Sequence, residues 1–372
     1  DPSPLREQGE AGAGPRLILQ FIFHGISVAI LVLHAVVSVL ATGKARHAAG
    51  AFHGINVVVP TYNEAETIGS CLESLMKNES ANPPHATYVL DDNSSDGTAQ
   101  IASTYSGRIS IIQRPQRTSK ADALNHAVHN IQGDIFAIVD GDCVVGPQWL
   151  GGLVSPLSDD SVGISTGSVL VQNRNDSALT RMQSCEMAFL CHQLIRPVER
   201  VGMLYSINGN NFAFSRSCWE KVGGFDPARL TEDTDFAIRT RAAGLQVRSA
   251  DSKVFTRVPS RFRELLRQRR RWYIGWYQNL SNTNLLAGAI FILLFYYAFF
   301  FFVASFSILS LAFLFAYYIE LSITYRKAYG RASILNPLAF IVLAPFFTTA
   351  VIASAIPSAL SGRDRLTVER HW

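Results

Sequence analysis

Apolar residues are distributed unevenly along the chain, with dense stretches near both ends and a mixed pattern between them. Residues 17–42 contain no Asp, Glu, Lys or Arg, and their number suits a helix that crosses a bilayer. A secretory signal is the alternative, but the apolar run is longer than a signal core. Residues 285–356 predict two or three further transmembrane helices. We therefore expect a membrane protein with one globular domain over residues 51–256 and tails over residues 1–16 and 357–372.

Within the central domain, short β-branched runs alternate with segments of helical spacing. The predicted strands are residues 55–60, 88–90, 109–113 and 135–139, and the predicted helices are residues 64–77, 96–105 and 120–131. This alternation is typical of a parallel α/β sheet. Such sheets bind ligands at the carboxyl ends of their strands, so polar residues at those positions are candidates for a site.

Residues 257–284 have a different pattern, in which large apolar residues recur at helical spacing with arginines between them. A basic amphipathic helix at the membrane surface is the prediction for this region. An ordinary surface helix of the globular domain is the alternative. The terminal segments and this helix together predict an integral, multi-pass membrane protein.

Charge and cysteine content narrow the class of protein. The net charge of +4 comes largely from arginines beside apolar stretches, where anionic headgroups are a simpler partner than nucleic acid. The five cysteines are scattered and form no CxxC pair. A disulfide framework or a zinc site is therefore not expected, and a reducing compartment fits.

Two polar motifs follow the first two predicted strands. The first of these strands ends in Val-Pro-Thr61-Tyr-Asn63-Glu64, and this loop is a candidate for nucleotide binding. A helix cap at Asn63 is the alternative. Asp91-Asp92-Asn-Ser-Ser-Asp-Gly-Thr ends the second. Either carboxylate would accept hydrogen bonds from a uracil or ribose, and a capped turn is the alternative. A calcium loop is excluded because its twelfth position lacks an acidic residue.

The sequence Asp140-Gly141-Asp142 follows the fourth predicted strand, so both carboxylates are expected at the carboxyl edge of the sheet. Mg²⁺ and Mn²⁺ prefer oxygen ligands, and Mg²⁺ usually takes only one or two protein carboxylates together with phosphate oxygens. A metal there would neutralise the charge that develops on a departing nucleoside diphosphate. A DxD sequence on its own is common by chance, but its position after a strand makes Asp140 and Asp142 candidates for a divalent metal site.

Two motifs nearer the C-terminus carry further candidates. Glu232 and Asp233, in Thr231-Glu-Asp, are candidates for a general base that takes the proton of an acceptor hydroxyl; a helix N-cap at Thr231 is the alternative. In Gln-Arg-Arg-Arg-Trp, helical geometry places Gln268, Arg271 and Trp272 on one side. Arg271 suits a diphosphate and Trp272 a sugar ring, while a membrane-anchoring basic patch is the alternative.

The order and spacing of VPTYNE, DDNSSDGT, DGD, TED and QRRRW resemble family 2 glycosyltransferases over roughly residues 55–276. The final motif, with apolar segments on both sides, resembles the processive D,D,D,QxxRW branch, which includes cellulose, chitin, hyaluronan and poly-N-acetylglucosamine synthases. Ceramide glucosyltransferases resemble this pattern too. The chain differs from cellulose synthases at Asn208-Gly-Asn-Asn-Phe212, where they have Phe-Cys-Gly-Ser, which argues against cellulose as the product.

The resemblance implies a Rossmann-like GT-A fold, an inverting transfer and a role for each motif. Lys120 matches a lysine that such enzymes often have near the donor. The implied donor-binding residues are Thr61, Asn63, Glu64, Asp91, Asp92, Lys120, Asp140 and Gly141. Asp233 would be the base, Asp140 and Asp142 would hold Mg²⁺ or Mn²⁺, and the QRRRW residues would line the diphosphate and acceptor site.

The expected activity is extension of a β-linked polysaccharide from a UDP-sugar by a membrane-bound enzyme. Transfer of a single sugar to a lipid acceptor, such as ceramide or a polyprenyl phosphate, is the alternative. A catalytically silent scaffold is disfavoured because every carboxylate of the set is present. The expected location is the inner or plasma membrane, with the catalytic domain in the cytosol.

Overall fold

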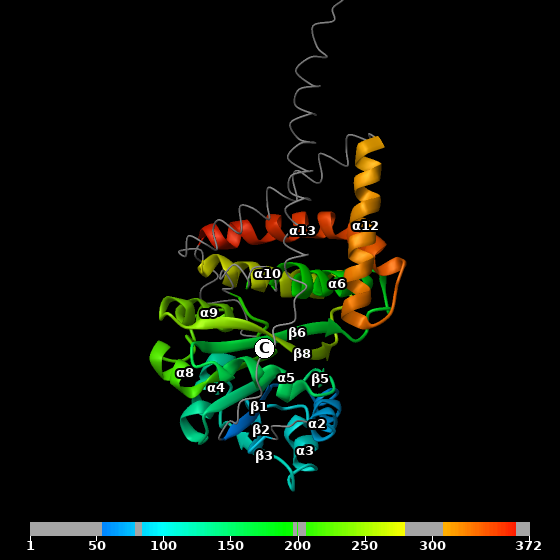
Figure 1. The fold of residues 1–372 in the computed structure, drawn as a ribbon. Coiled ribbons are helices and arrows are strands. Elements are labelled where there is room, and N and C mark those ends of the chain that lie inside the picture. Colours follow the sequence, from blue (N-terminus) through cyan, green and yellow to red (C-terminus); the bar gives the residue numbers. More distant parts are fainter. Residues whose placement is uncertain (1–53, 79–83, 196–198, 200–205, 280–307, 362–372) are drawn as a thin grey trace, which may run out of the picture.

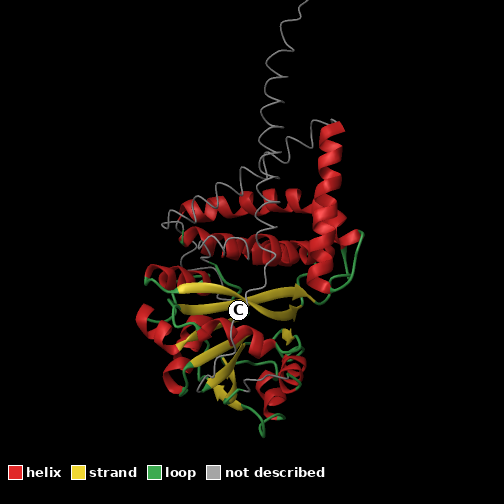
Figure 2. Ribbon diagram, in the orientation of Figure 1, coloured by secondary structure: helices red, strands yellow, loops and turns green. Residues whose placement is uncertain are grey.

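The computed structural model describes residues 54–78, 84–195, 199, 206–279 and 308–361. The described chain forms a β-sheet with helices on both faces and a separate tier of longer helices at one end (Figure 1). Figure 2 shows the same division, with the strands gathered below that tier.

The described strands pair in the order β3-β2-β1-β4-β7-β6-β8-β5. They are β1 (Ile55–Thr61), β2 (Ala86–Asp91), β3 (Ser110–Gln113), β4 (Ile135–Val139), β5 (Cys143–Val145), β6 (Val162–Val171), β7 (Asn211–Ser215) and β8 (Gln246–Thr256). The first four run parallel, whereas β7 is antiparallel to both β4 and β6. The predicted parallel sheet is confirmed for these four strands, and the whole sheet is mixed.

Continuous burial explains why the first strands read as apolar runs. All seven residues of β1 are buried, and successive side chains serve opposite faces of the sheet. Val57 and Val59 pack in one core cluster with α2 (Ile68–Met76), α3 (Thr98–Ser103) and α5 (Trp149–Val154). Val58 packs in a second cluster with α4 (Lys120–Asn130), α8 (Arg216–Val222) and α9 (Glu232–Ala242). The sheet is therefore covered on both sides.

The helices that cover the sheet are short. They are α2 (Ile68–Met76), α3 (Thr98–Ser103), α4 (Lys120–Asn130), α5 (Trp149–Val154), which continues into the 3-10 turn η1 (Ser155–Ser158), α8 (Arg216–Val222) and α9 (Glu232–Ala242). The first three confirm the helices expected at 64–77, 96–105 and 120–131, with later starts for α2 and α3.

A second layer of helices lies over the sheet domain. It consists of α6 (Ala178–Phe189) with the π-helical continuation η2 (Leu190–Ile195), α10 (Phe262–Gln278), α12 (Ile308–Tyr329) and α13 (Leu335–Ser361). In Figure 1, α13 runs alongside α10 and α6, and α12 stands across them. Met182, Leu265, Leu321 and Phe340, one from each helix, pack in a common apolar cluster.

Polar contacts fasten the C-terminal helices to the rest of the molecule. The Tyr329 hydroxyl accepts a hydrogen bond from the Val171 backbone at 2.9 Å and donates to the Ser184 carbonyl at 3.2 Å. The Asn336 side chain is fully buried and donates to the Ser184 hydroxyl at 2.8 Å. These bonds join α12 and α13 to α6 and to the end of β6, so the two helices pack as part of the same folded unit as the sheet.

The predicted transmembrane helices have two outcomes. The span at residues 17–42, and the part of residues 285–356 that precedes residue 308, lie outside the described residues. None of the helices that the structure describes combines the length and the apolar character needed to cross a bilayer. The amphipathic helix expected within residues 257–284 is present as α10, but its apolar side packs against α6 and α13.

Candidate active site

The carboxylates predicted to form the site meet at one edge of the sheet, where β1, β2 and β4 end. Asp140 follows β4, and Asp233 lies in the first turn of α9. Lys120, the first residue of α4, donates hydrogen bonds to Asp140 and, at 3.0 Å, to the Gly209 carbonyl. Three distant parts of the chain therefore converge on one ammonium group.

The first motif forms the wall of this site. The Thr61 hydroxyl donates to Glu64 Oε2 at 3.2 Å. That oxygen lies so close to Gly141 that a β-carbon at position 141 would collide with it. The pKa of Glu64 is raised well above its usual value by burial and by the negative charges of Asp142 and Asp140. Glu64 and Gly141 thus belong to the carboxylate cluster itself.

Asn63 joins two loops and does not cap a helix. Its backbone N–H donates to the Ser94 hydroxyl, and its side-chain oxygen accepts from the Ser95 N–H, both at 2.9 Å. The helix cap considered for Asn63 is wrong, because α2 begins only at Ile68. These bonds hold the VPTYNE loop against the DDNSSDGT loop.

Asp91 and Asp92 are fully buried, and both already have partners in the protein. Asp91 accepts from the Ser94 N–H at 3.3 Å. Asp92 accepts from the Thr118 N–H at 2.8 Å and forms an ion pair with Arg114 at 3.6 Å. These carboxylates therefore shape the predicted nucleotide pocket by fixing the loops around it.

Sequence reasoning missed a stacked pair beside these loops. The guanidinium of Arg117 lies over the Tyr62 ring, 4.0 Å from its centroid. Arg114 and Arg117 both follow β3, so the rule that ligands bind at the carboxyl ends of strands was the signal available in the sequence. An aromatic ring with a cation at its face suits contact with a nucleobase.

The two aspartates of the DGD motif are held differently. Asp140 is paired with Lys120, and its side chain is 26% exposed. Burial and the charges of Asp142 and Asp233 raise the pKa of Asp140 to about 6, against the opposing effect of Lys120. Asp142 accepts a hydrogen bond from the Thr256 hydroxyl at 3.0 Å. One carboxylate thus faces a cation, and the other is fixed by β8.

The acidic pair at the start of α9 faces the same cation. Burial and the charge of Asp233 raise the pKa of Glu232 to about 7, and burial also raises the pKa of Asp233. The positive charges of Lys120 and Arg271 lower both values. The Thr231 side chain makes no capping bond, so a simple N-cap does not account for this motif.

Backbone packing around Asp233 is unusually close. Gly209, in the connection that precedes β7, approaches so tightly that a β-carbon there would lie 2.5 Å from Asp233 Oδ2. The Gly209 carbonyl also accepts from Lys120, so this residue lies between Asp233 and the lysine that pairs with Asp140. Only glycine leaves room at that point.

The structure brings one of the predicted QRRRW residues to the carboxylates. The positive charge of Arg271 acts on Glu232 and Asp233. Trp272 instead carries the Arg269 guanidinium over its ring at 4.1 Å, and Gln268 is half-buried. Arg269 itself is 3% exposed and forms a 2.6 Å ion pair with Glu186 of α6, so the middle of the motif is structural.

The donor set suits a small divalent cation that shares its shell with a diphosphate. Within the described residues, no group of three or more His, Cys, Asp or Glu side chains is arranged to hold a metal alone. Asp140 and Asp142 supply two carboxylates in a cluster whose negative charges raise the pKa of Glu64. Mg²⁺ commonly binds through one or two carboxylates plus substrate phosphates, so these residues fit such an ion.

Comparison with curated proteins finds relatives among glycosyltransferases. A probable glycosyltransferase YdaM of Bacillus subtilis is 29% identical over 231 residues, which cover 59% of this chain and 54% of that protein. An N-acetylglucosaminyltransferase of Rhizobium sp. is 28% identical over 232 residues, covering 59% of this chain and 51% of the relative. This chain thus spans about half the length of both proteins.

Two further likenesses extend beyond the sheet domain. A beta-monoglucosyldiacylglycerol synthase of Trichormus variabilis is 26% identical over 305 residues, covering 74% of this chain and 63% of that protein. The mannosyltransferase PcManGT of Pyrobaculum calidifontis, solved with GDP-Man and Mn²⁺, superposes with a TM-score of 0.56 at 19% identity. That superposition covers 90% of this chain and 99% of the other, and it establishes a common fold.

The match to a protein family covers more than half of the chain. Residues 53–275 match the family described as "Glycosyltransferase like family 2". This range runs from β1 to α10 and includes every sequence motif of the site. The chain therefore belongs to the glycosyltransferase-like family 2.

Proposed function

We propose that this enzyme transfers a sugar from a UDP-sugar with inversion at the anomeric carbon, with Asp233 as the general base. The observation that carries the proposal is the convergence of Asp140 and Asp233 on Lys120, with Arg271 acting on the acidic pair from α10. A donor diphosphate and an acceptor hydroxyl need such an arrangement of cations on one side and a base on the other.

The reaction forms one bond and breaks one. The acceptor hydroxyl oxygen attacks the anomeric carbon, its proton passes to Asp233, and the bond from that carbon to the diphosphate oxygen breaks with its electron pair on the diphosphate. Attack from the face opposite the leaving group inverts the configuration. A carboxylate with a raised pKa is a better base near neutral pH than an ordinary aspartate, which suits the environment of Asp233.

Positive charge is needed where the diphosphate leaves. Burial alone would lower the pKa of Lys120, but the charges of Asp140, Glu232 and Asp233 outweigh it and raise that pKa, so Lys120 stays protonated. Lys120 and Arg271 would bind the diphosphate. Mg²⁺ or Mn²⁺ at Asp140 and Asp142 would supply further neutralisation of the leaving group.

The acceptor that we propose first is a growing β-linked glycan of the kind that processive synthases extend, which rests on the QRRRW pattern. A lipid acceptor is the second candidate, because the site lies under helices with an apolar outer face. Leu335, Leu338, Val342 and Phe346 recur along one side of α13, and their exposed fractions range from 47% to 66%. The basic residues Arg326, Lys327 and Arg331 stand exposed near one end of this face.

These features also support the proposal of a membrane-bound enzyme with a cytosolic catalytic domain, since an apolar face with basic residues beside it suits anionic headgroups. Flotation with anionic vesicles tests the surface contact. Leu338→Gln with Phe346→Gln should weaken vesicle binding and leave nucleotide release in solution within about twofold. Unchanged flotation would refute the contact at α13. Labelling of introduced cysteines from outside the cell would refute the cytosolic placement.

The activity is tested by incubating the purified protein with a panel of nucleotide-sugars, with added Mg²⁺ or Mn²⁺, and measuring nucleotide release. Products are then sized and digested with linkage-specific hydrolases. An alkali-stable product of high mass supports the polymer, and a single extractable glycolipid supports the lipid acceptor. A folded preparation that turns over no UDP-sugar contradicts the proposal.

A further inference from the structure

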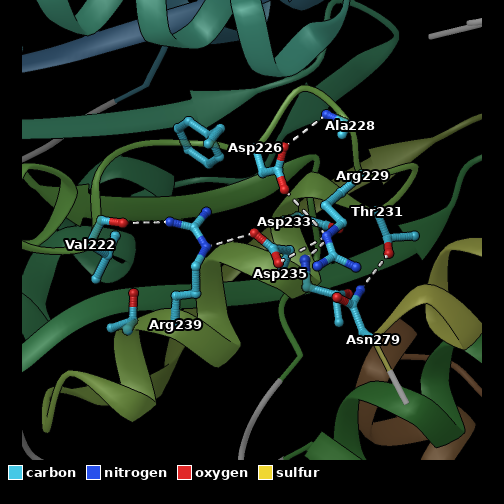
Figure 3. Close-up of polar contacts among 12 residues, drawn as sticks. Val222, Asp226, Ala228, Arg229, Thr231, Asp233, Asp235, Arg239 and Asn279 are labelled. Carbon is cyan, nitrogen blue, oxygen red and sulfur yellow. Dashed lines mark hydrogen bonds and ion pairs between the residues drawn. The ribbon is translucent and has the colours of Figure 1, made fainter. Parts of the chain in front are cut away.

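The loop that leads to Asp233 is held by a polar network that no sequence motif reveals. This loop, residues 226–231, joins α8 to α9 and lies against the C-terminal end of α10 (Figure 3). Its partners are Gln278, the last residue of α10, and Asn279, which follows it; they are 48 or 49 residues away in sequence. The network therefore connects the element with the acidic pair to the element with Arg271.

Arg229 makes the central contacts of the network. Its Nη1 donates to the carbonyl of Gln278, the last residue of α10, at 2.7 Å. Its Nε lies 3.3 Å from Asp226 Oδ2 and 3.5 Å from Asp235 Oδ1. One guanidinium thus bridges the loop, the first turn of α9 and the end of α10.

The Asp235 carboxylate holds the Arg229 guanidinium in place. Its side chain is 8% exposed, and its Oδ2 accepts from Arg239 Nε at 2.7 Å. Arg239 in turn donates to the Val222 carbonyl at the end of α8 at 2.6 Å. A nearly buried carboxylate with cations on two sides is strongly held, and it lies only two residues beyond Asp233.

A second set of contacts joins the same elements. The Leu230 N–H donates to Gln278 Oε1 at 3.1 Å, and the Asn279 side chain donates to the Thr231 hydroxyl at 3.3 Å. A β-carbon at Gly275 would lie 2.6 Å from the Thr231 methyl carbon, so α10 touches the loop directly there.

The contacts fall on the face of α10 that carries Arg271. Residues four apart on a helix lie on one side, which aligns Arg271, Gly275 and Asn279. The surface that grips the loop is therefore a continuation of the surface that presents Arg271 to the acidic pair.

We propose that Arg229 and Asp235 are positioning residues that clamp the loop of residues 226–231 onto α10, so that Asp233 is held in a fixed position relative to α10. This inference rests on the proposed role of Asp233 as the base. Misplacement of a reacting group by about 1 Å can cost roughly 100-fold in rate. Loss of the clamp would thus impair transfer without removing any group that touches the substrates.

The test is a double-mutant cycle on the full-length enzyme. Arg229→Gln should lower kcat for transfer by roughly 10- to 100-fold and change the donor KM by less than about threefold. In an Asp233→Asn background the same substitution should cost less than about twofold, because a misplaced base matters only while it is a base. Arg229→Lys keeps the charge and should recover part of the rate.

Arg248→Gln is the matched control, since Arg248 is 35% exposed against 34% for Arg229 and is also paired with a carboxylate, but in a different part of the molecule. It should leave kcat within about twofold. Should Arg229→Gln fold poorly, Gln278→Met removes only the acceptor for the Leu230 N–H and should lower kcat in the same direction, again without effect in the Asp233→Asn background.

The outcomes separate the clamp from the catalytic assignment. An equal loss from Arg229→Gln in the wild-type and Asp233→Asn backgrounds refutes the clamp and leaves the base intact. A loss confined to the donor KM also refutes it. Near-wild-type transfer by Asp233→Asn alone refutes the base, and the clamp falls with it.

Discussion

The edge of the sheet and the layer of long helices are built on opposite principles. At the edge, burial raises the pKa values of Glu64, Asp140 and Glu232, and the negative charges of neighbouring carboxylates raise them further. In the layer, apolar side chains pack and the buried polar group of Asn336 is satisfied by hydrogen bonds. Carboxylates whose pKa values are raised by neighbouring negative charges as well as by burial are candidates for catalysis, so we propose that the first region performs the chemistry and the second supports it.

We expect the largest loss of activity from a substitution in the DGD motif. Asp142→Asn keeps the hydrogen bond from Thr256 but removes a carboxylate from the proposed metal site. Turnover should fall below detection, and chelation of wild type should do the same until Mg²⁺ or Mn²⁺ is restored. Nucleotide release is the measurement, with the exposed Asp160→Asn as the control. Full activity in excess chelator would remove the metal from the mechanism.

The next effect is expected at Gly209, where the backbone touches both Asp233 and Lys120. Gly209→Ala places a carbon against Asp233 and should lower kcat by roughly 10- to 100-fold. Gly107→Ala is the matched control, because a β-carbon there meets nothing within 4 Å. Equal rates for the two variants would show that the close packing at Asp233 is irrelevant to transfer.

The crowded carboxylates also predict the pH profile. Burial raises the pKa of Asp233, so kcat/KM should begin to fall with decreasing pH above the range usual for an aspartate, as the base becomes protonated. Glu232, whose pKa is raised to about 7, titrates together with it. Glu232→Gln removes a negative charge beside Asp233, lowers the pKa of Asp233 and should move the acid limb to lower pH. A limb near pH 4 in wild type would contradict the electrostatic picture.

A substitution in the helix layer should lower stability more than it lowers activity. Glu186→Gln leaves the buried Arg269 without its countercharge and should destabilise the fold by roughly 2 to 4 kcal/mol, which thermal unfolding would record as a lower Tm. We expect a smaller change in kcat, within about threefold below the unfolding temperature. A large loss of kcat at unchanged Tm would make the ion pair part of the catalytic machinery.

The two regions also differ in how much of them the sequence predicts. The residues at the edge of the sheet could be predicted because they follow β-branched runs. Ligands of such sheets bind at the carboxyl ends of the strands, which places Thr61, Asp91 and Asp140 together without any knowledge of distant contacts. The search for β-branched runs does not find β6. Its residues, Val162–Val171, mix Ser, Thr and Gly with apolar residues, although all ten positions are buried. Its place between β7 and β8 depends on pairing across the chain.

The helix layer was harder to predict because its contacts are distant in sequence. A run of arginines on α10 looks solvated, yet Arg269 is buried through its pairing with Glu186, 83 residues away. The apolar face of α10 predicts a membrane contact equally well as a protein contact, and only the position of α13 decides between them. No local sequence pattern indicates the clamp at Arg229, because its partner Gln278 is 49 residues away in sequence.

The central claim is that Asp233 acts as a base and Arg271 as a diphosphate ligand, and one paired experiment tests it most directly. Donor affinity and transfer rate are measured on Asp233→Asn and Arg271→Ala. The account predicts that Asp233→Asn changes donor affinity little and lowers transfer by roughly 10² to 10⁴-fold, whereas Arg271→Ala weakens donor binding as well. Transfer by Asp233→Asn within tenfold of wild type, with normal donor binding, would contradict the account.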